Sequence, residues 1–311
     1  MFDWLTVFQD PNVQWILIGC MLLGVSSGVI GSFAYLRKQS LMGDALSHAA
    51  LPGVCIAFML SGSKSIVFFL IGAAAAGIVT TFGIGFITRN TRIKQDTALA
   101  IVLSTFFGLG IVLLTQIQHS GNGNQSGLDK FLFGQAATMM KVDVLIMVIF
   151  SIVLIGICTI LFKEFKLLSF DPGFARGIGY PVAFLDQLIM FLIVVAVVVG
   201  IQAVGVVLMA SLLITPAVTA RYWTEKLGLM VVFSGVIGAF SGLAGTFISA
   251  NGNNLPTGPL IMLVATSMFV FSVIAAPRRG ILSKIMLRAS VRSKVRQEQS
   301  MLQVDRGEKS V

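Results

Sequence analysis

The chain has 311 residues, of which 56% are hydrophobic and only 11% are charged, and its mean hydropathy is +0.92. These values exclude a soluble globular domain, in which about a quarter of the residues are charged. The formal net charge of +9 does not indicate nucleic-acid binding, because the cations lie next to apolar segments. We therefore expect an all-α, polytopic membrane protein that binds no nucleic acid.

Nine segments are long and apolar enough to be membrane spans, since a spanning helix needs about 20 apolar residues. They cover residues 13–36, 43–62, 66–88, 97–116, 142–162, 182–202, 204–220, 228–248 and 258–276. The stretch 182–220 is ambiguous, because Gly200 and Gly205 interrupt one long apolar run. It can be a pair of helices, a re-entrant segment, or one helix and a loop, so eight spans is the alternative.

The distribution of Lys and Arg predicts the orientation of the bundle. Nothing before Arg37 is basic, while Asp3 and Asp10 are acidic, so we expect the first span to be retained and the N-terminus to lie outside. Nine spans then place 19 of the 22 Lys and Arg residues, and the C-terminus, in the cytoplasm. The 19 are Arg37, Lys38, Arg89, Arg92, Lys94, Lys163, Lys166, Arg176, Arg221, Lys226 and nine residues from Arg278 onwards. Those outside are Lys64, Lys130 and Lys141.

The chain divides into a transmembrane domain over residues 1–280 and a basic cytoplasmic tail over residues 281–311. Within residues 281–297, apolar and basic side chains alternate in a way that suits a helix lying on anionic membrane lipid. The simpler interpretation is a topology anchor followed by a frayed terminus. Cys20, Cys55 and Cys158 fall inside predicted spans without paired spacing, which is typical of buried apolar residues rather than of a disulfide or a zinc site.

Small residues recur at four-residue steps in several predicted spans. Examples are Gly24 with Gly28, Ala73 with Gly77, and Ser234 with Gly238 and Gly242. Such spacing lets two helix backbones approach closely, so it predicts one compact bundle.

Residues 43–53, with the sequence GDALSHAALPG, contain the strongest candidate for a functional site. Asp44 and His48 stand one turn apart on one helix face and offer a carboxylate oxygen and an imidazole nitrogen to a cation. Pro52 removes the N–H group that would have bonded to the carbonyl of His48, which frees another oxygen. Ionisable residues at membrane depth are functional by default. The alternative is that Asp44 stabilises the start of the helix and His48 merely bonds to Asp44.

Two side chains are too few for a divalent ion, which takes four to six ligands. A two-fold dimer would bring two copies of Asp44 and His48 together. Carboxylate plus imidazole suits Mn(II), Fe(II) or Zn(II), whereas a copper site more often recruits sulfur. Cys55 and Met59 continue the same face, but such residues are more often part of a core than ligands.

Five motifs together resemble the manganese/zinc/iron permeases of ATP-binding-cassette importers over residues 10 to about 278. They are GDALSHAALPGV, KQDTALAIVLSTFFGLGIVLL, SFDPGFARGIG, VGVVLMASLLITPAVTAR and NLPTGPLIML, and the stretch GLDKFLFGQAA is most similar to the manganese-type members. The resemblance implies a dimeric membrane subunit, of identical chains or close paralogues. It also implies an extracytoplasmic metal-binding lipoprotein and a separate cytoplasmic ATPase as partners. It places Asp44 and His48 on the metal path.

The segment FDPGFARGIGYP has the features of a short, well-capped helix. Asp171 is a candidate N-cap, Pro172 the first helical residue and Gly179 the C-terminal stop, while Phe174 and Ile178 share one face. Alone, this pattern favours a simple connector. The resemblance implies a coupling helix that docks on the ATPase and contains Pro172, Phe174, Ala175 and Arg176.

The sequence therefore predicts a bacterial cell-membrane permease for Mn, Zn or Fe that is not itself an enzyme and binds no permanent cofactor. It contains neither the G-x-x-x-x-G-K-[ST] phosphate-binding loop nor the H-E-x-x-H zinc motif of metalloproteases. The alternative is an ion-coupled secondary transporter, in which Asp44 and His48 would relay protons rather than bind metal.

Overall fold

The computed structural model describes residues 11–61, 66–119, 134, 136, 139–252, 255–277 and 280–283. Every regular element within these ranges is helical, which confirms the predicted all-α class. The helices are α2 (Pro11–Leu36), α3 (Ser40–Ser61), α4 (Ile66–Asn90), α5 (Gln95–His119), α7 (Lys141–Ile160), α8 (Phe162–Phe170), α9 (Pro172–Gly177), α10 (Val182–Val204), α11 (Val206–Trp223), α12 (Leu227–Asn251) and α13 (Thr257–Ala275). Most of the predicted tail, residues 284–311, lies outside the described residues.

Eight helices in the described part of the chain are long and apolar enough to cross a membrane, namely α2, α3, α4, α5, α7, α10, α12 and α13. The sequence predicted nine such segments, with eight as the alternative. The remaining predicted segment, residues 204–220, forms α11, a helix of 18 residues and therefore about 27 Å long. Gly205 separates α10 from α11 with φ of 93°, a left-handed conformation that glycine adopts without strain. Of the three interpretations of residues 182–220, the pair of helices is correct.

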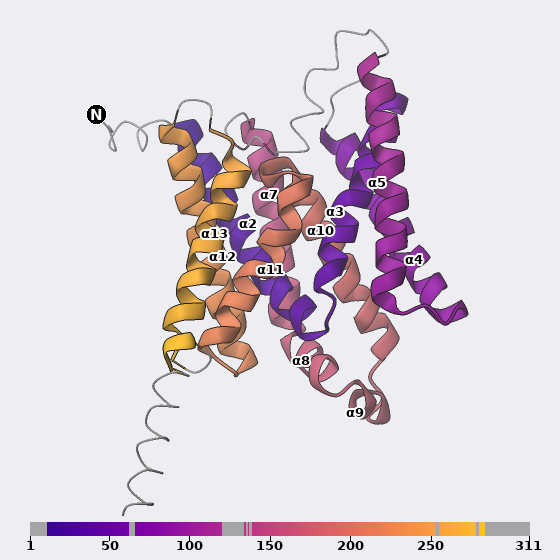
Figure 1. Ribbon diagram of the computed structural model, residues 1–311, viewed down its shortest axis with the longest axis vertical. Coiled ribbons are helices and arrows are strands. Elements are labelled where there is room, and N and C mark those ends of the chain that lie inside the picture. Colours follow the sequence, from indigo (N-terminus) through magenta and orange to yellow (C-terminus); the bar gives the residue numbers. More distant parts are fainter. Residues whose placement is uncertain are drawn as a thin grey trace, which may run out of the picture.

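The helices form one bundle with α2, α3, α10 and α11 towards its middle (Figure 1). α4 and α5 pack on α3 at one flank, and α12 packs on both α2 and α13 at the other. Of the most apolar stretch of α2, 78% is buried inside the protein, whereas the corresponding share in α4, α5, α7 and α13 is 28%. The peripheral helices therefore present most of their apolar surface outwards, as lipid-facing helices do.

Helices α2 and α12 touch through their backbones. A Cβ atom at Gly24 of α2 would collide with the carbonyl group of Gly238 in α12, and one at Gly238 would collide with that of Gly24. One turn along, the hydroxyl of Ser234 donates a hydrogen bond of 2.7 Å to the carbonyl of Gly28. Two of the spaced sets thus pack against each other, and the helix backbones approach closely there, as the spacing predicted.

Basic residues of the described chain gather at one end of the bundle. The turns α2–α3, α4–α5 and α11–α12, together with α8 and α9, lie at the lower end in Figure 1. They contain Arg37, Lys38, Arg92, Lys94, Lys163, Lys166, Arg176 and Lys226, and Arg89 and Arg221 stand in the last turns of α4 and α11. Lys141, at the start of α7, belongs to the opposite end. The fold therefore gathers at one end the ten cations before Arg278 that the sequence assigned to the cytoplasm.

We predict that Gly24→Ala destabilises the protein, because a methyl group has no room against the Gly238 carbonyl and the two helices must separate. The expected loss is about 1–3 kcal/mol, typical of overpacking. The matched control is Gly156→Ala in α7, where no atom lies within 4 Å of the added Cβ. Thermal unfolding in detergent should show a lower melting temperature for Gly24→Ala alone. Equal melting temperatures for both variants would contradict the close contact.

Candidate functional site

Asp44 and His48 lie together on α3, as their spacing predicted. Nε2 of His48 is 3.4 Å from Oδ1 of Asp44, and the side chains are 17% and 42% exposed, respectively. The helix holds this arrangement because residues four apart are neighbours on its surface. The pair therefore presents one partly exposed carboxylate next to a largely enclosed imidazole.

Among the described residues, Asp44 makes no capping contact. α3 begins at Ser40, so Asp44 lies beyond the first turn, where the free N–H groups of a helix are found. Within the described residues, its polar partner is His48. The neighbouring hydroxyl of Ser47 donates a 2.7 Å hydrogen bond to the carbonyl of Gly43 and is buried. The helix-start interpretation of Asp44 thus lacks the contact that it requires.

The second ring nitrogen of His48 is the most informative atom of the site. Nδ1 is buried and has no hydrogen-bond partner in the part of the chain that is described. The ring of Phe107 from α5 packs edge-on against the imidazole, with centroids 4.7 Å apart and an interplanar angle of 77°. If Nε2–H faces Asp44, Nδ1 carries a free lone pair. A carboxylate that orients an imidazole in this way is a common arrangement behind metal-binding histidines.

Beyond His48, α3 is packed tightly against its neighbours. Pro52 is buried within the helix and cannot donate to the carbonyl of His48. A Cβ atom at Gly110 of α5 would come within 2.9 Å of the Pro52 ring. Cys55 is buried, with its sulfur 3.9 Å from the Gly110 carbonyl, while Met59 is 52% exposed. Cys55 is therefore a packing residue between α3 and α5.

One chain does not supply a complete set of metal ligands. No group of three or more His, Cys, Asp or Glu side chains that could hold a metal ion occurs among the described residues. A divalent transition metal needs more donors than Asp44 and His48 provide. Any such ion at this position would take its remaining ligands from water, backbone carbonyls or a second chain.

The segment after α8 forms the short capped helix that its sequence predicted. Asp171 is the N-cap, and its Oδ1 accepts a 2.8 Å hydrogen bond from the backbone N–H of Phe174. Pro172 is the first residue of α9, and Gly179, with φ of 91°, lies directly after the C-cap. Phe174 is 57% exposed, whereas Ala175 is buried. α9 therefore extends from the lower end of the bundle in Figure 1 with an exposed aromatic side chain.

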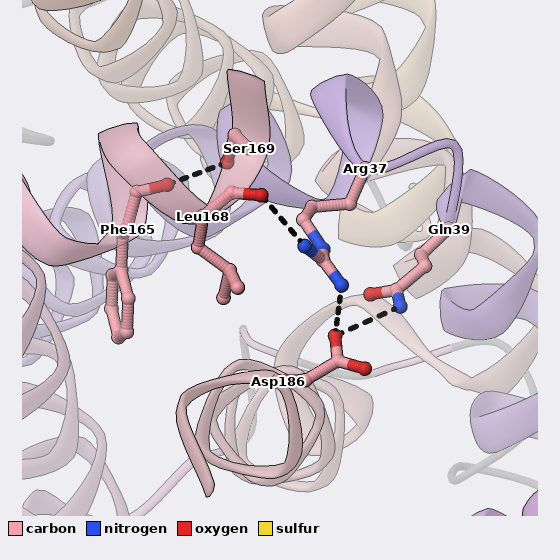
Figure 2. Close-up of polar contacts among 6 residues, drawn as sticks. All are labelled: Arg37, Gln39, Phe165, Leu168, Ser169 and Asp186. Atoms are coloured by element: carbon pink, nitrogen blue, oxygen red, sulfur yellow. Dashed lines mark hydrogen bonds and ion pairs between the residues drawn. The ribbon is translucent and has the colours of Figure 1, made fainter. Parts of the chain in front are cut away.

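A second polar cluster, which the sequence did not reveal, joins α2, α8 and α10 (Figure 2). The guanidinium of Arg37 pairs with Asp186 through Nη2 and donates from Nη1 to the carbonyl of Leu168 over 2.9 Å. Nε2 of Gln39 lies 3.5 Å from the same Asp186 oxygen. Asp186 is the single acidic residue in the long apolar run 182–220, which is the signal that could have singled it out.

The ABC 3 transport family model matches residues 9–276. The chain belongs to this family. The manganese transport system membrane protein MntC of Bacillus subtilis is 53% identical over 98% of this chain and 70% of its own length. The zinc transport system membrane protein TroC of Treponema pallidum is 45% identical over 92% of this chain and 96% of its own.

The fold agrees with this assignment. PsaBC from Streptococcus pneumoniae, solved in complex with Fab, matches with a TM-score of 0.79 and 34% identity over 89% of this chain and 96% of that one. Together with the eight apolar helices, membership of the ABC 3 family identifies a multi-pass protein of the bacterial inner membrane. The resemblance inferred from the five motifs is thereby confirmed.

Proposed function

We propose that this chain is the permease subunit of an ATP-binding-cassette importer that passes Mn²⁺ into the cytoplasm, with Zn²⁺ and Fe²⁺ as lesser substrates. The main support is the 53% identity to a manganese transport system membrane protein over 98% of the chain. The 45% identity to a zinc transport protein supports Zn²⁺ as the second substrate. The chain has no phosphate-binding loop of its own, which suits a permease whose ATP is hydrolysed by a partner subunit.

Asp44 and His48 are the proposed contacts for the metal. The buried Nδ1 of His48, which has no partner among the described residues, supports this role, because a native structure seldom leaves such a nitrogen unsatisfied unless it has a function. A second permease subunit, identical or closely related, would complete the ligand set across a two-fold axis. In the proposed orientation, α9 faces a cytoplasmic ATPase, and the opposite end receives metal from an extracytoplasmic binding lipoprotein.

We predict that Asp44→Asn and His48→Gln each lower uptake of radioactive manganese by about tenfold or more, because both remove a metal contact. The measurement compares cells that contain equal amounts of each variant in the membrane. Matched controls are Asp96→Asn and His119→Gln, which make the same changes at exposed positions of α5. Wild-type uptake by both site variants would refute the metal-path assignment. Uptake that does not require ATP would instead favour the proton-relay alternative.

We predict that Phe174→Asp abolishes uptake while the permease still inserts and dimerises. The carboxylate would lie on the exposed face of α9 and prevent apolar docking on the ATPase. Phe174→Leu, which keeps an apolar side chain there, is the control and should transport nearly normally. Copurification of the ATPase with each variant measures docking directly. If Phe174→Asp transports at wild-type rates, residues 171–179 form only a connector.

We predict that the lower end of the bundle in Figure 1 is cytoplasmic. In a chain whose three cysteines are replaced by alanine, a membrane-impermeant thiol reagent added to intact cells should label His119→Cys at the far end of α5. It should label Thr91→Cys, in the α4–α5 turn, only after permeabilisation; both positions are exposed. The reverse pattern would invert the proposed orientation and place α9 outside.

A further inference from the structure

Arg37 connects the helix before α9 to the helix that carries Asp44 and His48. It follows the last residue of α2 and reaches α8 through the Leu168 carbonyl and α10 through Asp186, as Figure 2 shows. Its side chain is only 14% exposed. These contacts join segments that are 131 and 149 residues away in the sequence, so they are a property of the tertiary fold.

The contact with Leu168 arises from the proline that begins α9. In a continuing helix, the Leu168 carbonyl would accept a hydrogen bond from the N–H of residue 172, but that residue is Pro172 and has no N–H. Arg37 Nη1 supplies the missing donor over 2.9 Å. A cation is also favourable there, because the carbonyl ends of α8 carry partial negative charge. The start of α9 and the position of Arg37 are thus linked through one carbonyl group.

The turn after Arg37 transmits its position to α3. The N–H of Lys38 donates to the carbonyl of Tyr35, and the N–H of Gln39 donates to that of Ala34, the two bonds of a Schellman motif. Lys38 adopts φ of 57° to make this turn. The carbonyl of Gln39 then accepts the N–H of Met42 in the first turn of α3. Three residues therefore join α2 to α3, and Asp44 lies two residues after Met42.

The cluster also contains unused hydrogen-bonding capacity. Nε of Arg37 and Oε1 of Gln39 are buried without partners among the described residues. One is a donor and the other an acceptor, so a modest rearrangement of the turn could satisfy both. A half-satisfied polar cluster of this kind suits an element with two arrangements of similar free energy.

We propose that Arg37 and Asp186 are positioning residues that transmit movement of α9 to α3 and so couple ATP hydrolysis to release of metal from the Asp44–His48 pair. This inference rests on the proposed function of the chain as an importer permease. Arg37 holds Leu168 and Asp186 with two different nitrogens of one rigid, planar guanidinium, whereas the lysine ammonium donates from a single nitrogen at the end of a flexible stem. Arg37→Lys therefore keeps the charge and loses the fixed geometry of the bridge.

The test uses the complete transporter, permease with its ATPase, in proteoliposomes supplied with the metal-binding protein. Manganese uptake and ATP hydrolysis are measured in the same vesicles. We expect Arg37→Lys and Asp186→Asn to hydrolyse ATP while manganese uptake per ATP falls at least about fivefold, the lower range of coupling between two sites. In the double variant, manganese uptake per ATP should fall little further than in either single variant, as expected of residues that act together. Arg89→Gln, an exposed arginine at the same end, is the matched control and should keep the wild-type ratio.

Different outcomes separate this inference from the proposed function. An unchanged ratio of uptake to hydrolysis in Arg37→Lys would overturn the link while leaving the importer assignment intact. A proportional loss of uptake and hydrolysis would also overturn the link, since it indicates a purely structural role. If the Asp186→Asn permease fails to assemble with its ATPase, the result for Arg37→Lys alone tests the link. Absence of ATP-dependent manganese uptake by the wild-type transporter would refute the proposed function itself.

Discussion

Direct backbone contact around α2 is the constraint that positions the rest of the bundle. On one side, Gly24 touches Gly238 of α12, and on another, a Cβ atom at Gly31 would collide with the Leu213 carbonyl of α11. Apolar side chains gain little from leaving lipid for a protein interior, so helix association in a membrane depends on such close packing. Two contacts without intervening side chains fix the rotation and the height of α2. They therefore determine where Arg37, at its end, meets α8 and α10.

Local sequence patterns were sufficient wherever the relevant forces are local. Apolar runs predicted the spanning helices, Asp171 and Pro172 predicted the start of α9, and the four-residue spacing of Asp44 and His48 predicted their contact. The glycine that separates α10 from α11 was recognisable, but a hydropathy profile cannot show which of Gly200 and Gly205 breaks a helix. Gly205 does so, because Gly200 serves a packing role instead, with Met209 of α11 occupying the space a side chain would need.

Long-range polar contacts could not be predicted from the sequence. Arg37 looked like one cation of a positive cytoplasmic loop, and its partner Asp186 lies 149 residues away. A hydropathy pattern assigns each residue to a membrane side or a span, and it holds no information on which helix ends meet. The same limitation applies to the edge-on packing of Phe107 against His48. Both contacts depend on how α3, α5 and α10 are arranged around α2, which side-chain volumes in the whole bundle decide.

The unpaired polar atoms near α3 differ in kind from the unpaired hydroxyls elsewhere in the described chain. Ser27 and Thr80 also have buried oxygens without partners, but a hydroxyl on a helix can turn towards a carbonyl of the preceding turn. One buried oxygen of Glu164 in α8 is unpaired among the described residues as well. The imidazole of His48 and the guanidinium of Arg37 point their nitrogens in fixed directions. Leaving such a group unsatisfied costs about 1–3 kcal/mol. A protein that retains this cost at Arg37, just before α3, and at His48, within α3, has a use for both groups, which agrees with the proposed roles in metal transfer and coupling.

The position of the pair along α3 restricts how a metal could be held there. His48 is eight residues after Ser40 and so about 12 Å along the helix, in the half of α3 nearest α8 and α9. Farther along α3, Gly53 touches the backbone of Gly72 in α4, so the two helices are in direct contact at that point. Asp44, in contrast, is 42% exposed on a helix of a membrane bundle. Contact between a carboxylate and lipid is unfavourable, so this face of α3 must meet water or another protein. A second permease subunit against α3 would satisfy that requirement and would also supply the ligands that one chain lacks.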